Sequence, residues 1–157
     1  MTKVCIVGAG AIGGFIGTRL AAAGRAEVSA IARGATLQAL QAHGWRLNSA
    51  TGLVQAPARA SSHAAELGPQ DLVVIAVKGP ALAAVAPAVA ALCGPRTQVL
   101  AAMNGVPWWF FDALPGLLRR AHGVGEFALE RRVLLELGKR HVRAVARPGR
   151  IGKLAER

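Results

Sequence analysis

The residues VGAGAIGG, at positions 7 to 14, are the strongest constraint on how this chain can fold. They follow a near-continuous apolar run over 3–7, which is typical of a strand buried on both faces of a parallel sheet. A helical pattern over 11–23 comes directly after them. Glycines in the spacing GxGxxG between a strand and a helix indicate a turn that holds a dinucleotide pyrophosphate. A tight turn without a ligand is the alternative interpretation.

Strand and helix patterns alternate along the next ninety or so residues. Further strands are expected over 27–32, 71–77 and 98–103, helices over 35–43 and 80–93, and a small hairpin over 45–48 and 53–56. We expect Pro80 in the first turn of the second of these helices and Gly94-Pro95 at its end. This order predicts an α/β fold with a doubly wound parallel sheet, a Rossmann-type NAD(P)-binding domain.

The formal net charge of +11 raises the question of a nucleic-acid partner. Most of that charge, +7, lies in residues 113–157, and no zinc-finger spacing or aromatic RNA-binding motif accompanies it. We therefore expect no nucleic-acid partner. The composition fits a dinucleotide-binding domain over 1–116 and a basic tail over 117–157.

The chain has no uninterrupted apolar run near the ~18 residues that a membrane span needs, so we expect no membrane partner and a cytoplasmic protein. Cys5 and Cys93 lie in apolar runs and are interpreted as small buried hydrophobic residues in a reducing compartment. No metal site is expected, because no cysteines or acidic residues lie at ligand spacing from the four histidines, His43, His63, His122 and His141.

In a doubly wound sheet, ligands bind beyond the carboxyl ends of the strands. After the first strand, Gly8 permits the tight turn, Gly10 lets the pyrophosphate approach the backbone, and Gly13 lets the helix pack on the strand. The helix N-terminus adds free N–H groups and a positive dipole. The predicted cofactor-binding residues of this turn are Gly8, Ala9, Gly10, Ala11, Ile12 and Gly13.

Three polar side chains follow the other predicted strands. Arg33 stands twenty positions after Gly13, where an NAD-binding protein carries an acid, and its guanidinium suits a ribose 2′-phosphate. This favours NADP(H), although a solvated arginine is the alternative. Lys78 and Asn104 follow the next two strands and are candidates for binding both cofactor and substrate, or, alternatively, ordinary strand-end and turn residues.

The stretches VCIVGAGAIGGFIGTRLAAAG, ARG, DLVVIAVKGPAL and MNGVPWW, in this order, resemble the ketopantoate reductase family, the NADPH-dependent 2-dehydropantoate 2-reductases. The resemblance covers residues 2 to about 116. It implies that the glycine turn holds the pyrophosphate, Arg33 the 2′-phosphate, and Lys78 and Asn104 the cofactor and a 2-oxo acid. The implied reaction reduces 2-dehydropantoate to pantoate, on the route to pantothenate and coenzyme A. Some members of the family act on other 2-oxo acids. The resemblance also implies that full-length relatives can form homodimers.

The sequence departs from the family after FFDALPG. The resemblance implies a second, helical domain that supplies a general-acid lysine at positions beyond residue 157, so no catalytic residue can be assigned here. The Arg-, Gly- and Leu-rich residues 117–157 favour a truncated or frameshifted product over a divergent tail. The hypotheses left open are a truncated reductase, a stand-alone NADP-binding or redox-sensing module without catalysis, nucleic-acid binding, which the charge distribution disfavours, and a different Rossmann dehydrogenase.

Overall fold

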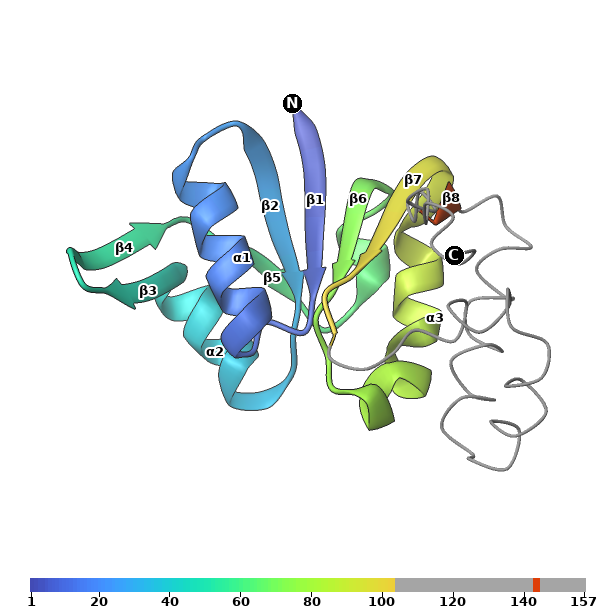
Figure 1. Cartoon of the computed structure of the whole chain (residues 1–157). Helices are drawn as coiled ribbons and strands as arrows, with labels where there is room; N and C mark the ends of the chain where they lie inside the picture. The colour runs from blue at the N-terminus through green and yellow to red at the C-terminus, as the bar shows by residue number, and fades with distance from the viewer. Residues whose placement is uncertain (104–142, 145–157) are drawn as a thin grey trace, which may run out of the picture.

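The computed structural model describes residues 1–103 and the two-residue strand 143–144 (Figure 1). The elements are β1 (Thr2–Val7), α1 (Ala11–Ala22), β2 (Ala26–Ile31), α2 (Gly34–His43), β3 (Trp45–Ser49), β4 (Gly52–Ala56), β5 (Arg59–Ser61), the 3-10 helix η1 (Ala64–Glu66), β6 (Gln70–Ile75), the 3-10 helix η2 (Gly79–Ala81), α3 (Leu82–Leu92), β7 (Cys93–Ala101) and β8 (Arg143–Ala144).

The strands of the main sheet are all parallel and lie in the order β5-β2-β1-β6-β7-β8. From β1 the chain first builds outward through β2 to β5, then returns to the other side of β1 to place β6 and β7. The strand order therefore reverses between β1 and β6, which is the switch point that defines a doubly wound sheet. The predicted fold class is confirmed.

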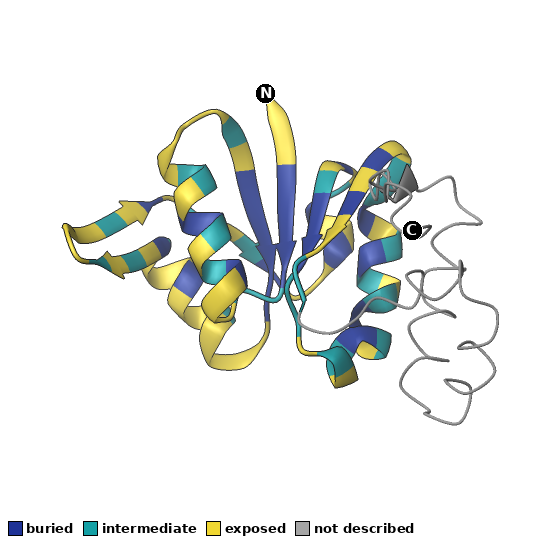
Figure 2. Ribbon diagram, viewed as in Figure 1, coloured by how far each residue is buried: buried dark blue, intermediate teal, exposed yellow. Residues whose placement is uncertain are grey.

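Side-chain alternation along β1 divides the core into two layers, one on each face of the sheet. Figure 2 shows that the carboxyl-terminal part of this strand is buried. Val4 and Ile6 pack toward α1, α2 and the hairpin, whereas Cys5 and Val7 pack toward η1 and α3. All four side chains are buried. Burial on both faces explains why this strand reads as a continuous apolar run rather than as an alternating one.

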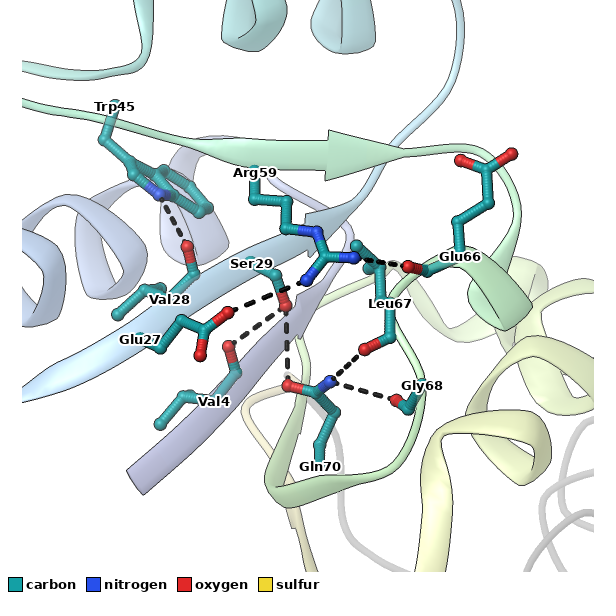
Figure 3. A network of polar contacts seen from close by, with 10 residues as sticks. All are labelled: Val4, Glu27, Val28, Ser29, Trp45, Arg59, Glu66, Leu67, Gly68 and Gln70. Atoms are coloured by element: carbon teal, nitrogen blue, oxygen red, sulfur yellow. Dashed lines mark hydrogen bonds and ion pairs between the residues drawn. The ribbon is translucent and has the colours of Figure 1, made fainter. Parts of the chain in front are cut away.

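The predicted hairpin is confirmed as the antiparallel pair β3 and β4, which lies against α1. Its anchor is Trp45, which is 1% exposed and covers Gly17 of α1. A Cβ at position 17 would overlap the indole ring, so glycine is required for this close approach. The indole Nε1 donates to Val28 O of β2 at 3.4 Å (Figure 3).

A buried polar network fixes the connection into β6 (Figure 3). Gln70 is 7% exposed, and its Nε2 donates to Leu67 O and Gly68 O, both at 3.0 Å. Ser29 of β2 donates its hydroxyl proton to Val4 O at 3.3 Å or to Gln70 Oε1 at 3.5 Å. These bonds satisfy the polar side chains that the fold buries here.

Several predicted boundaries were wrong. Strand β7 begins at Cys93 rather than at 98, directly after α3 and without a separate Gly94-Pro95 turn. The pairing of β7 with β6 is irregular opposite Gln70, where Thr97 Oγ1 donates to Gln70 O and accepts from the N–H of Gly94. The Thr97 hydroxyl thus replaces part of the backbone hydrogen bonding between β6 and β7. No local sequence pattern predicts this substitution.

Three further differences are smaller. Strand β6 ends at Ile75 instead of 77, and the three-residue strand β5 was not predicted at all. Cys5 is fully buried as expected, but Cys93 is only half-buried.

None of the helices in residues 1–103 is long and apolar enough to cross a membrane. The predicted domain boundary at 116 lies outside the described residues and stays a prediction.

Candidate functional site

The strands of the sheet end level with one another at their carboxyl edge. Val7 of β1 pairs with Ile31 of β2 on one side and with Ile75 of β6 on the other. One more backbone bond continues each ladder: the N–H of Gly8 donates to Ile31 O at 3.0 Å, and that of Ala76 donates to Val7 O at 2.9 Å. The segments that follow β1, β2 and β6 therefore leave the sheet side by side (Figure 1).

The turn after β1 requires glycine at two positions for different reasons. Gly8 has φ +93°, and a Cβ there would lie 2.6 Å from Val77 Cγ1. At Gly13, a Cβ would overlap Gly8 O and lie 2.9 Å from Ile6 Cγ2, because α1 packs directly on the turn and on β1. Both glycines are thus required by the packing of the chain itself.

Gly10 differs, because no atom lies within 4 Å of where its Cβ would be. It is the N-cap of α1, with φ −72°, and the N–H of Gly14 donates to its carbonyl at 2.7 Å. No side chain caps this helix, and its first turn holds no acid. The first N–H groups of α1 have no hydrogen-bond partner within the helix, and they lie at the positive end of the helix dipole. The missing side chain at Gly10 leaves open space beside donors suited to an anion.

Arg33 follows β2 at the same edge. It is exposed, has an extended backbone (φ −138°, ψ 161°) and precedes the first residue of α2. No ion pair involves it within the described part of the chain. Glu27, the acid of β2, lies at the opposite end of that strand and pairs with Arg59 at 3.7 Å. The carboxyl end of β2 therefore offers a guanidinium and no carboxylate.

Lys78 comes three residues after β6 and is exposed. Its carbonyl accepts the N–H of Ala81 at 2.9 Å, which starts η2 and fixes the backbone at this position. Because β2 and β6 flank β1, Arg33 and Lys78 follow strands about 10 Å apart, two strand spacings, with the glycine turn between them. Asn104 lies outside the described residues, and its place in the site stays a prediction.

The buried thiol of Cys5 is not part of this edge. Burial raises the pKa of Cys5 from 9.0 to about 11, although a hydrogen bond with Ser29 lowers it slightly. Burial also raises the pKa of Cys93. Both thiols are therefore protonated near neutral pH and are poor nucleophiles. Their interpretation as packing residues fits this chemistry.

Sequence reasoning missed one group of polar residues at the carboxyl edge. Strand β5 ends at Ser61, which pairs with Ile31, so the residues after it lie next to the segment that carries Arg33. Ser61 Oγ donates to Glu66 Oε2 at 2.6 Å, and His63 Nδ1 lies 3.7 Å from Glu66 Oε1. His63 was interpreted as a surface or packing residue, and β5, the strand that brings it to this edge, was not predicted.

A doubly wound parallel sheet whose first strand leads through GxGxxG into a helix defines a Rossmann-type domain. Residues 4–107 match the family described as Ketopantoate reductase PanE/ApbA. The chain belongs to this family, as the sequence resemblance implied.

Individual relatives agree. The chain is 47% identical over 116 residues to a 2-dehydropantoate 2-reductase of Mesorhizobium japonicum, covering 74% of this chain and 36% of that protein. A provisionally named ketopantoate reductase of Ralstonia solanacearum MolK2 has a similar structure, with a TM-score of 0.68 and 57% identity over 71% of this chain and 35% of that one. The D-mandelate dehydrogenase solved with NADH and anilino(oxo)acetate has a TM-score of 0.58 and 27% identity, over 71% and 36% of the chains. The chain thus spans about a third of the length of these relatives.

Proposed function

We propose that this chain is the NADP(H)-binding part of a 2-dehydropantoate 2-reductase, an oxidoreductase that delivers hydride from NADPH to a 2-oxo acid. In this proposal the turn from Gly8 to Gly13 holds the pyrophosphate, Arg33 holds the 2′-phosphate, and Lys78 and Asn104 bind the cofactor and the substrate. When bound, the coenzyme supplies the hydride; the residues of this chain bind and orient it.

The open space at Gly10, together with its position at the uncapped N-terminus of α1, is the observation that carries this proposal. Close packing explains the glycines at positions 8 and 13, but nothing in the protein fills the volume that a side chain at position 10 would take. The uncapped N-terminus of α1 adjoins this volume. A pyrophosphate placed there would accept hydrogen bonds from backbone N–H groups and gain from the helix dipole.

Arg33 decides between the two nicotinamide coenzymes in this proposal. A charge-assisted bond from its guanidinium to the 2′-phosphate contributes about 1.5–3 kcal/mol, which NADH cannot gain. The D-mandelate dehydrogenase of the same fold was solved with NADH, so coenzyme preference has to be measured for each such chain. The absence of an acid at the carboxyl end of β2 supports the phosphorylated form.

The substrate end of the site is only partly supplied by these residues. Lys78 is exposed at the edge and offers a positive charge for the carboxylate of a 2-oxo acid. The family resemblance places the general-acid lysine in a second, helical domain, and no residue of these 157 is assigned to that role. We therefore expect the 157-residue chain to bind NADPH but to reduce ketopantoate poorly or not at all.

Calorimetric titration of the 157-residue chain with NADPH and with NADH tests the proposal. We expect NADPH to bind about 10- to 150-fold more tightly, and Arg33→Ala to remove that preference while leaving the affinity for NADH unchanged. Arg46→Ala is the matched control, since Arg46 is an exposed arginine on the β3–β4 hairpin. Equal affinities for both coenzymes in the folded wild type would refute the assignment of NADP(H).

A steady-state assay with NADPH and ketopantoate tests the second part of the proposal. Robust turnover by the purified chain would show that the acid is present within these 157 residues. Turnover that requires a second, helical domain of the kind the family resemblance implies would support the proposed separation of cofactor binding from proton donation.

A further inference from the structure

A group of polar residues follows β5 at the carboxyl edge, and two of its side chains, His63 and Glu66, are exposed there. We define it as the His63 cluster: Ser61, Ser62, His63 and Glu66. The imidazole of His63 is 76% exposed and the carboxylate of Glu66 is 64% exposed, so packing does not require either group. Neither belongs to the glycine turn or to the segments that carry Arg33 and Lys78.

The register of the sheet fixes where this cluster lies. Ser61 pairs with Ile31, and the N–H of Ala32 donates to Ser61 O at 3.1 Å, so β5 and β2 end at the same level. Arg33 and His63 each come two residues after those paired positions. The glycine turn, Arg33 and His63 thus follow three adjacent strands, in the order β1, β2, β5, at intervals of about 4.8 Å.

Internal bonds hold the cluster in one arrangement. Ser61 Oγ accepts the backbone N–H of His63 at 2.8 Å and donates to Glu66 Oε2 at 2.6 Å. Ser62 Oγ and His63 Nδ1 are 3.0 Å apart, and Glu66 Oε1 lies 3.7 Å from the same nitrogen. Both side-chain contacts of the imidazole therefore involve Nδ1, and Nε2 has no partner among residues 1–103.

The chemistry of the cluster favours a ligand that donates hydrogen bonds. A carboxylate beside Nδ1 favours the tautomer with the proton on that nitrogen, which leaves Nε2 of His63 as an acceptor. Glu66 adds a negative charge, which disfavours a phosphate at this position and separates the cluster from the task of Arg33. An adenine base presents a flat ring and an exocyclic amine with two donor hydrogens.

We propose that His63 and Glu66 recognise the adenine base of the dinucleotide through its exocyclic amine. The inference rests on the proposed function, because it assumes that the pyrophosphate lies at the glycine turn and the 2′-phosphate at Arg33. The adenosine then extends outward along the strand ends, toward β5. Arg33 selects the phosphate on the ribose, and the His63 cluster selects the base attached to it.

The test uses NADPH and its hypoxanthine analogue, in which a carbonyl oxygen replaces the exocyclic amine. By titration calorimetry of the full chain, we expect NADPH to bind roughly 5- to 30-fold more tightly than the analogue. The carbonyl oxygen of the analogue would face two other acceptors, His63 Nε2 and the Glu66 carboxylate. His63→Phe keeps a flat ring without nitrogens, and Glu66→Gln removes the carboxylate. Each variant should bring the ratio of the two affinities to within about twofold.

Two controls separate this effect from others. His43→Phe changes an exposed histidine in the last turn of α2 and should keep the wild-type ratio. Arg33→Ala should weaken NADPH and its analogue equally and therefore also keep the ratio.

The outcomes distinguish this inference from the proposed function. A wild-type chain that binds NADPH and the analogue equally, or a His63→Phe variant that retains the wild-type ratio, refutes the inference and leaves the proposed function standing. A folded wild type that binds neither dinucleotide refutes the proposed function and the inference together.

Discussion

The same substitution at two glycines of one turn should have opposite consequences. Gly10→Ala should leave the fold intact and weaken NADPH binding, whereas Gly13→Ala should destabilise the fold. The reason lies in the surroundings of the added Cβ, which at position 10 meets no atom within 4 Å and at position 13 overlaps Gly8 O.

The stability effect of Gly10→Ala is small because two terms oppose each other. Alanine is a poorer N-cap than glycine, at a cost of about 0.5–1 kcal/mol. The φ of −72° at position 10 is allowed for alanine. Alanine also reduces the conformational entropy of the unfolded chain, which stabilises the fold by about 0.4–1 kcal/mol. The free energy of unfolding should therefore change by no more than about 0.5 kcal/mol.

The binding effect should be much larger. A methyl group in the open space at Gly10 keeps the pyrophosphate from the N–H groups of α1. Loss of one charge-assisted hydrogen bond costs about 1.5–3 kcal/mol, which corresponds to about a 10- to 150-fold rise in the Kd for NADPH. Gly13→Ala should lower the free energy of unfolding by about 1–3 kcal/mol, as is usual for overpacking.

Urea denaturation and calorimetric titration, run on both variants, measure the two effects. Gly94→Ala is the control, since a Cβ there makes only ordinary contacts at 3.6 Å or more and lies at the beginning of β7, away from the carboxyl edge. If Gly10→Ala binds NADPH like the wild type, no phosphate occupies that space and the cradle interpretation is wrong. If Gly13→Ala is as stable as the wild type, the packing of α1 on β1 is looser than the structure indicates.

Three further predictions concern the stability of the fold. Gly17→Ala should lower the free energy of unfolding by about 1–3 kcal/mol in urea, because the new methyl group overlaps the indole of Trp45; an unchanged midpoint would refute this contact. Thr97→Val should cost about 1–3 kcal/mol by the same assay, since Thr97 Oγ1 bridges the N–H of Gly94 and the carbonyl of Gln70; a neutral result would mean that water replaces it. Burial raises the pKa of Cys5 to about 11 from 9.0, so the unfolded chain loses this proton first and stability should fall between pH 9 and 11, by up to about 1.4 kcal/mol per pH unit. Cys5→Ala should flatten that part of the profile, and an equal slope in both proteins would contradict it.

Local patterns were sufficient to place several of the candidate site residues on the fold. The glycine turn could be predicted because its three glycines follow a strand and open a helix within a few residues, and the open space at Gly10 agrees with the role expected there. Arg33 could be placed at the carboxyl edge because the end of β2 is marked by the change from apolar to polar residues. The fold class followed from the order of the same elements.

The sequence by itself therefore determined the parts of this protein that depend on neighbouring residues: the turn after β1, the hairpin and the position of Arg33. Only the tertiary structure decided the pairing of β5 with β2, the early start of β7, the burial of Trp45 over Gly17 and the position of the His63 cluster after the strand next to β2. Each of these depends on contacts between residues far apart in the chain. Hydrophobic periodicity reports which face of an element is buried, but it carries no information about which distant strand or side chain will cover that face.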